Sequence, residues 1–187
     1  AADGGQEFFV RTMALCSPVM RQVVHHPVPV IAAVEGIATA AGCQLVASCD
    51  MAVATPTARF CTPGVDIGLF CSTPAVALSR AVPRKAAMEM LMTGRMVGAE
   101  EARALGLINR VAEDARAAAL DLAAQVAARS ARTIRVGKRG FLAQEGRALE
   151  EAYVTASQVM VENMLAEDAA EGIGAFLEKR KPTWQDR

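Results

Sequence analysis

The chain has 187 residues with 20 basic and 20 acidic side chains, so its formal net charge is zero and its pI is about 7. This balance favours neither nucleic acid nor an anionic membrane as a partner, because both attract basic proteins. Hydrophobic residues make up 52% and charged residues 21% of the chain, as expected for a globular protein with a sizeable core. No apolar run is long enough to span a bilayer.

The five cysteines form no Cys-x-x-Cys pair and have no metal-ligand spacing with His25 or His26. We therefore expect no metal. An odd number of cysteines without a signal peptide predicts reduced thiols and a cytoplasmic location, or a mitochondrial one in a eukaryote. The first five residues, AADGG, contain no initiator Met, so we expect the chain to be the interior of a longer domain.

Short strands and helices alternate in the first part of the chain. Helical spacing predicts a helix over residues 7–24, which Pro18 is expected to interrupt or kink. Strands are predicted over 30–34, 51–54, 59–62 and 107–111. Helices are predicted over 40–49, 73–80, 83–93 and 98–105, with a turn at Pro63-Gly64. From residue 113 the chain is predicted to be helical, over 113–129, 131–143, 147–165 and 167–180. We predict an α/β core over residues 1–110 and a helical region over residues 111–187.

The segment between Val30 and Asp50 is the most informative one. Its predicted helix begins with the small residues Ala40, Ala41 and Gly42. Small residues at a helix start let a ligand approach the backbone, and the free N–H groups there point at the ligand. If the ligand is a thioester, this site can hold a developing enolate oxygen.

Three separated motifs resemble the enoyl-CoA hydratase/isomerase (crotonase) superfamily. They are HPVPVIAAVEGIATAAGCQLVASCDMAVAT, LMTGRMVGAEEARALGLINRV and EGIGAFLEKRKPTW, and they occur in the family's order. The stretch TPGVDIGLFCSTP is typical of one subgroup. The resemblance implies a spiral of ββα turns with a C-terminal helical trimerisation region, assembled as a trimer or a dimer of trimers.

The resemblance also implies an acyl-CoA ligand, with the coenzyme A thioester as substrate and no separate cofactor. The thioester oxygen would lie between two backbone N–H donors. One donor matches Ala41, flanked by Ala40 and Gly42 in the ligand-binding run, and the other belongs to a family segment that precedes residue 1. In the tail, Phe176 and Lys179 match positions that meet coenzyme A; a packing Phe and a solvated Lys are the equal alternative.

Hydratases of this family use two glutamates, and both are replaced here. Gln44 occupies the first position and Gly64 the second. A glutamine amide can orient water but cannot take a proton at neutral pH, and glycine has no side chain. Because general acid–base catalysis contributes about 100- to 10,000-fold, these replacements argue against efficient hydration by the standard route.

Asp66 is the nearest replacement carboxylate. If the local backbone is extended, Asp66 faces the same side as Gly64 and could serve as the single base of an isomerase-type enolate reaction. The alternative is a solvated or capping Asp in a turn. Cys43, beside the predicted oxyanion donor, could be a nucleophile, but it has no evident His partner and packing explains it better.

The sequence thus predicts a crotonase-fold, acyl-CoA-binding protein of the hydratase/isomerase type that stabilises a thioester enolate, as a lyase or isomerase of fatty acid metabolism. The alternative is a catalytically silent acyl-CoA binder or regulatory homologue.

Overall fold

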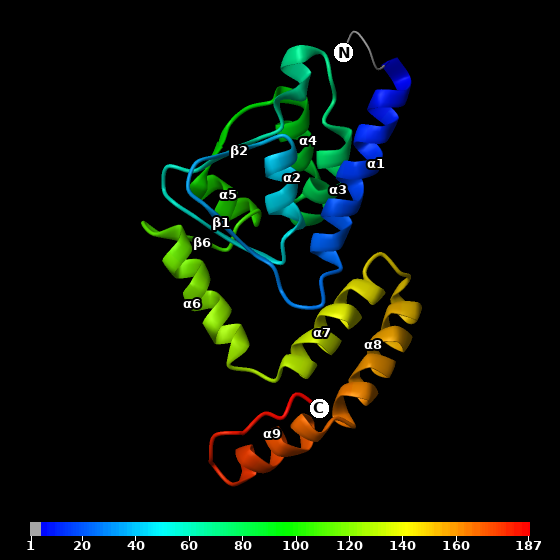
Figure 1. The fold of residues 1–187 in the computed structure, drawn as a ribbon, viewed down its shortest axis with the longest axis vertical. Coiled ribbons are helices and arrows are strands. Elements are labelled where there is room, and N and C mark those ends of the chain that lie inside the picture. The colour runs from blue at the N-terminus through cyan, green and yellow to red at the C-terminus, as the bar shows by residue number, and fades with distance from the viewer. Residues whose placement is uncertain (1–4) are drawn as a thin grey trace. The chain divides into compact units, whose positions relative to one another are not determined.

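The computed structural model describes residues 5–187, and residues 1–4 lie outside this range. The chain forms two compact units (Figure 1). The first comprises the chain up to His26 and Val30–Asp121, and the second comprises Pro27–Pro29 and Leu122–Arg187. The sequence predicts a different division, into an α/β core over residues 1–110 and a helical region over residues 111–187, and this division stays a prediction.

The first unit contains two small sheets. One sheet has the order β1-β3-β6, with β1 (Ile31–Val34), β3 (Met51–Ala54) and β6 (Arg110–Val111) all parallel. The other has the order β2-β4-β5, from β2 (Ile37–Thr39), β4 (Arg59–Cys61) and β5 (Val97–Gly98). Strands β2 and β4 are parallel, whereas β4 and β5 are antiparallel. The sequence did not predict β2 or β5, which are three and two residues long and lie just before the helices α2 (Ala41–Ser48) and α5 (Ala99–Leu105).

Helices cover these sheets. Those of the first unit are α1 (Gly5–Val24), α2 (Ala41–Ser48), α3 (Ser72–Ala81), α4 (Arg84–Thr93) and α5 (Ala99–Leu105), with the 3₁₀ helix η1 at Pro63–Ile67. Helix α1 runs beside α2 (Figure 1) and is continuous through Pro18, so the expected interruption is absent. The core lies between the helices and strands, and Phe60, Leu78 and Met90 are its largest fully buried side chains.

Helix α6 (Ala115–Ala127) leads from the first unit into the second, which contains α7 (Ala131–Gln144), α8 (Leu149–Met164) and α9 (Glu167–Leu177). Helices α7 and α8 form an antiparallel hairpin (Figure 1). Gly140 allows their close approach, because a Cβ there would lie 2.5 Å from Cγ1 of Val159. None of the helices in residues 5–187 combines the length and the apolar character needed to cross a membrane.

Candidate functional site

The two segments that carry the predicted catalytic positions emerge at the same end of one sheet. Strands β2 and β4 are parallel, with Thr39 paired with Cys61 at their last residues. Helix α2 follows β2, and η1 follows β4. Because the carboxyl ends of parallel strands meet at one edge, the start of α2 and the start of η1 are brought together.

The backbone at the start of α2 has an unusual conformation. Ala40, the residue before the helix, has φ 47° and ψ −112°, and its N–H donates to the Cys61 carbonyl oxygen at 3.0 Å. A positive φ is unfavourable for a residue with a Cβ, and such strain is concentrated at functional positions. This sharp turn lets the chain pass directly from β2 into α2. This turn could not be predicted from the sequence, because alanine rarely adopts this conformation.

The first two residues of α2, Ala41 and Gly42, border accessible space. Ala41 is exposed, and no acceptor for its N–H is found within residues 5–187. A Cβ built on Gly42 meets no atom within 4 Å, so the space beside it is open. The start of a helix carries about half a positive charge, so this surface is suited to an oxyanion.

Gln44 lies one turn further along α2. The residue is 8% exposed, and its backbone N–H donates to the Ala40 carbonyl oxygen. The predicted first glutamate position is therefore held by a buried amide close to the helix start. An amide can donate and accept hydrogen bonds, but it cannot act as a proton acceptor in acid–base chemistry at neutral pH.

The second glutamate position, Gly64, has no room for a side chain. A Cβ there would lie 2.6 Å from the Leu69 carbonyl oxygen and 2.8 Å from Cys71 Sγ. The Leu69 N–H also donates to the Gly64 carbonyl oxygen at 2.9 Å, which closes the segment onto itself. Glycine at this position is thus required by the local packing. The role of Cys71 in filling this space was not foreseen from the sequence.

Asp66 does not face the same side as Gly64. Both residues belong to η1, where three residues complete a turn, so the extended backbone assumed for Asp66 is absent. Its exposed carboxylate lies against the end of α4, where both oxygens are 3.3 Å from the ideal Cβ position of Gly94. The hypothesis that Asp66 is a base therefore loses the extended backbone on which it rested, and it stays a prediction.

Cys43 is nearly inaccessible, at 1% exposure. Burial, with smaller contributions from Cys61 and Cys71, raises the pKa of the Cys43 thiol to about 12. Since the thiolate is the nucleophile, a thiol with this pKa is unreactive at neutral pH. The structure favours packing over nucleophilic catalysis for Cys43. Within residues 5–187, no group of three or more His, Cys, Asp or Glu side chains could hold a metal ion.

Phe176 and Lys179 belong to the second unit. Phe176 is 82% exposed on α9. The helix ends at Leu177, two residues before Lys179, whose φ of 56° places it in the left-handed region. The predicted helix over 167–180 is therefore too long at its end.

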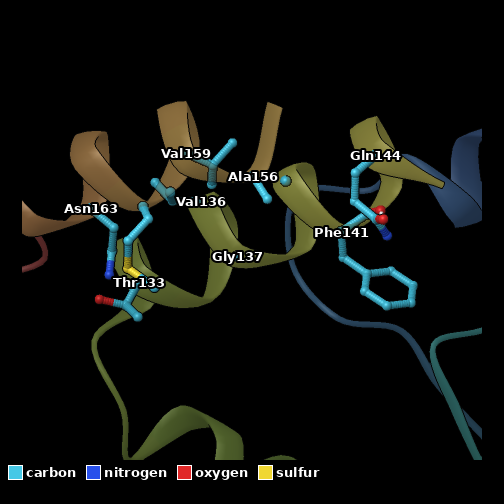
Figure 2. A pocket seen from close by; sticks show the side chains of 10 residues that line it. Thr133, Val136, Gly137, Phe141, Gln144, Ala156, Val159 and Asn163 are labelled. Carbon is cyan, nitrogen blue, oxygen red and sulfur yellow. The ribbon is translucent and has the colours of Figure 1, made fainter. Parts of the chain in front are cut away.

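The second unit also contains a pocket of ≈ 330 Å³ between α7 and α8. Thr133 and Asn163 lie at one end of it, and Phe141 and Gln144 at the other (Figure 2). None of the predicted site residues lines this pocket. The Oδ1 atom of Asn163 is buried and has no hydrogen-bond partner within the described chain. The pocket is thus a feature separate from the predicted oxyanion site.

The α/β core and the helix start at Ala41 can be compared with known proteins. The family model described as enoyl-CoA hydratase/isomerase matches residues 12–187. The chain therefore belongs to the enoyl-CoA hydratase/isomerase family, and its structural neighbours have the crotonase fold.

The subgroup indicated by the sequence is that of enoyl-CoA hydratase domain-containing protein 3, mitochondrial. The mouse (Mus musculus) protein of this name is 50% identical over 182 residues, which cover 96% of this chain and 61% of the mouse protein. The human (Homo sapiens) protein is 50% identical over 184 residues, 97% of this chain and 61% of the human protein. The chain thus spans about three fifths of the length of these relatives.

Two solved structures support the same assignment. The crystal structure of human enoyl-CoA hydratase domain-containing protein 3 superposes with a TM-score of 0.92 at 49% identity, over 96% of this chain and 72% of the human one. An enoyl-CoA hydratase from Mycobacterium smegmatis gives a TM-score of 0.91 at 49% identity, over 98% of this chain and 72% of the other. The predicted family and the crotonase-type α/β fold are confirmed.

Proposed function

We propose that this protein binds an acyl-CoA thioester and stabilises its enolate oxygen at the Ala41 N–H. The strained backbone of Ala40 carries the proposal, because this turn leads directly into the exposed start of α2. The Ala41 N–H there is a donor without an acceptor within residues 5–187, and the space beside Gly42 is open. In enzymes, one such donor contributes about 3–4 kcal/mol to transition-state stabilisation. The family membership supports the same ligand class. The thioester is proposed to be the substrate, without a separate cofactor.

The reaction that fits these residues is enolate chemistry rather than efficient hydration. Gln44 cannot act as a general base at neutral pH, and the packing around Gly64 leaves no space for a carboxylate. A catalytically silent acyl-CoA binder is the second candidate, and the same closed space at Gly64 favours it. The two candidates differ in whether a bound thioester loses a proton from its α carbon. Since neither Gln44 nor Gly64 can accept that proton, the acceptor in the enolate reaction is another group, such as Asp66 or water.

Exchange of the thioester α-proton with deuterated water, followed by NMR, separates the two candidates. The full-length protein should exchange the α-proton of butyryl-CoA, and Ala41→Pro should slow the exchange about 100- to 1,000-fold by removing one N–H donor. Proline is accepted at the first position of a helix, but it restricts the preceding residue to extended backbone, so Ala41→Pro removes the strained turn at Ala40 together with the N–H donor. The matched control is Arg84→Pro at the exposed first position of α4, which should exchange at the wild-type rate.

Each outcome decides a specific point. Circular dichroism and native mass spectrometry are the controls that test whether both proline variants are folded. Calorimetric binding of butyryl-CoA without any exchange would support the silent binder and refute the enolate reaction. Exchange unaffected by Asp66→Asn would remove Asp66 from the mechanism. Hydration of crotonyl-CoA at the rate of an ordinary hydratase would refute the argument from Gln44 and Gly64.

The proposed assembly is a homo-trimer or a dimer of trimers formed through the helical second unit. Large apolar side chains exposed on α8 support this, because contiguous exposed apolar surface marks interaction sites. They are Leu149, Tyr153, Val154, Met160, Val161 and Met164. Light scattering of the full-length protein tests the assembly, and a monomer at micromolar concentration would refute it.

The proposed location is mitochondrial in a eukaryote and cytoplasmic otherwise. The mouse and human relatives are named as mitochondrial proteins.

A further inference from the structure

Three cysteines gather beside the start of α2. Cys43 lies in the first turn of α2, Cys61 ends β4, and Cys71 directly precedes α3. Helix α2 packs against α3, and Cys71 packs against the core cluster that contains Cys43. Besides burial, the charges of Cys61 and Cys71 raise the pKa of the Cys43 thiol, so the three thiols share one neighbourhood. It belongs to the first unit, at the edge where α2 and η1 begin.

Two of these thiols are committed to the protein interior. Cys43 and Cys61 are each 1% exposed. The Cys61 thiol donates a hydrogen bond to Thr39 Oγ1 at 3.3 Å, and the high pKa of Cys43 keeps its thiol protonated at neutral pH. Cys71 differs, because it is only half-buried and its side chain makes no capping hydrogen bond to α3. Of the three, it is the thiol that a ligand can reach.

The Cys71 thiol occupies space in which the side chain of the second glutamate is predicted. Its Sγ lies 2.8 Å from the ideal Cβ position of Gly64. In a glutamate the carboxyl carbon lies about 2.5 Å from Cβ, which is the distance across two C–C bonds. The sulfur is therefore about as far from the Gly64 Cβ position as the carboxyl group of a glutamate would be. A thiol at this place can take over the role of the absent carboxylate, because cysteine serves as a general acid or base in enzymes.

We propose that Cys71 is the base of the enolate reaction. The proposal rests on the acyl-CoA binding and enolate chemistry proposed above. The Cys71 thiolate takes the proton from the α carbon and becomes a thiol. The electron pair of the broken C–H bond forms the C=C bond of the enolate, and the carbonyl π pair moves to the oxygen held by the Ala41 N–H. In deuterated water the thiol exchanges its proton with solvent, and the reverse step returns a deuteron to the α carbon and regenerates the thiolate.

Exchange of the α-proton of butyryl-CoA, measured by NMR on the full-length protein, tests this role. Cys71→Ser keeps nearly the size of cysteine, but a serine hydroxyl is not a base at neutral pH. It should slow the exchange about 100-fold or more, the usual contribution of general acid–base catalysis, and leave calorimetric binding of butyryl-CoA unchanged. The matched control is Cys49→Ser at the other end of α2, where the cysteine is also half-buried. Cys49→Ser and Asp66→Asn should both exchange at the wild-type rate.

Reversible blocking of the thiol provides an independent measurement. Methyl methanethiosulfonate converts a thiolate to a methyl disulfide and releases methanesulfinate, and dithiothreitol reverses the change. The reagent should abolish exchange in the wild-type protein, dithiothreitol should restore it, and the residual exchange of Cys71→Ser should not respond. Saturating butyryl-CoA should protect Cys71 from the reagent and leave the exposed Cys16 labelled, as peptide mass mapping measures.

The outcomes separate the role of Cys71 from the proposed function. Exchange by the wild-type protein with an unchanged rate in Cys71→Ser would overturn the role of Cys71 and leave the enolate chemistry standing. Loss of exchange in Asp66→Asn alone would assign the base to Asp66 instead. If Cys71→Ser fails to fold, exchange by wild-type protein that is fully labelled at Cys71, or labelling of Cys71 that butyryl-CoA does not slow, would overturn the proposal. Binding of butyryl-CoA without any exchange would refute the enolate reaction and the role of Cys71 together.

Discussion

The crossing of α7 and α8 depends on a glycine, and its replacement should destabilise the second unit. In Gly140→Ala the new Cβ would lie 2.5 Å from Cγ1, 3.1 Å from Cγ2 and 3.2 Å from Cβ of Val159. Because valine is branched at Cβ and stiff, the helices must shift, and such overpacking costs about 1–3 kcal/mol. Alanine gains about 1 kcal/mol over glycine in a helix, so the net loss in unfolding free energy should be about 0–2 kcal/mol.

Gly137→Ala is the matched control on the same helix. A Cβ at Gly137 meets no atom within 4 Å, so this variant should gain about 1 kcal/mol from helix propensity alone. The difference between the two variants, about 1–3 kcal/mol, isolates the overpacking. Urea unfolding followed by Trp184 fluorescence measures it, since Trp184 belongs to the same unit. Val159→Ala should rescue Gly140→Ala, and equal stability of the two alanine variants would refute the close crossing.

Three further predictions concern individual side chains. Gln44→Glu should raise α-proton exchange by about 100-fold or more if a base at that position is what the site lacks, whereas an unchanged rate would mean that α2 does not face the thioester. Iodoacetamide at pH 8 should label the exposed Cys16 and leave Cys43 unlabelled until urea unfolds the protein, because burial raises the pKa of the Cys43 thiol to about 12. Peptide mass mapping measures the labelling rates of both cysteines. Hydrogen bonds from Arg180 and the Thr183 N–H lower the pKa of Glu171 from 4.5 to about 2. The ionised Glu171 carboxylate therefore stabilises the folded protein fully above pH 4.5, and this contribution is lost as the pH falls toward 2. Urea unfolding between pH 2 and 6 should therefore be less pH-dependent in Glu171→Gln, and identical slopes would contradict the pairing.

Sequence pattern predicted the helices and strands that are long or buried on both faces. Helix α4 is an example, because Pro83 precedes it and Gly94 ends it in a left-handed conformation with φ 64°. Strand β3 agrees with its prediction because a short run of apolar residues is typical of a parallel strand. A strand of two or three residues is stabilised by its neighbours and not by its own pattern. Among the strands this short, β4 and β6 overlap predicted strands, whereas β2 and β5 were not predicted.

The sequence alone determined the family and the small residues at the start of α2, and it predicts that Gln44 and Gly64 replace the two glutamates of the family's hydratases. Only the tertiary structure decided the surroundings of these positions. Asp66 belongs to a 3₁₀ helix and not to extended backbone, and the space beside Gly64 is filled by Leu69 and Cys71. The physical reason is that residue identity is local, whereas the direction of a side chain and the space around it depend on segments that the fold brings together.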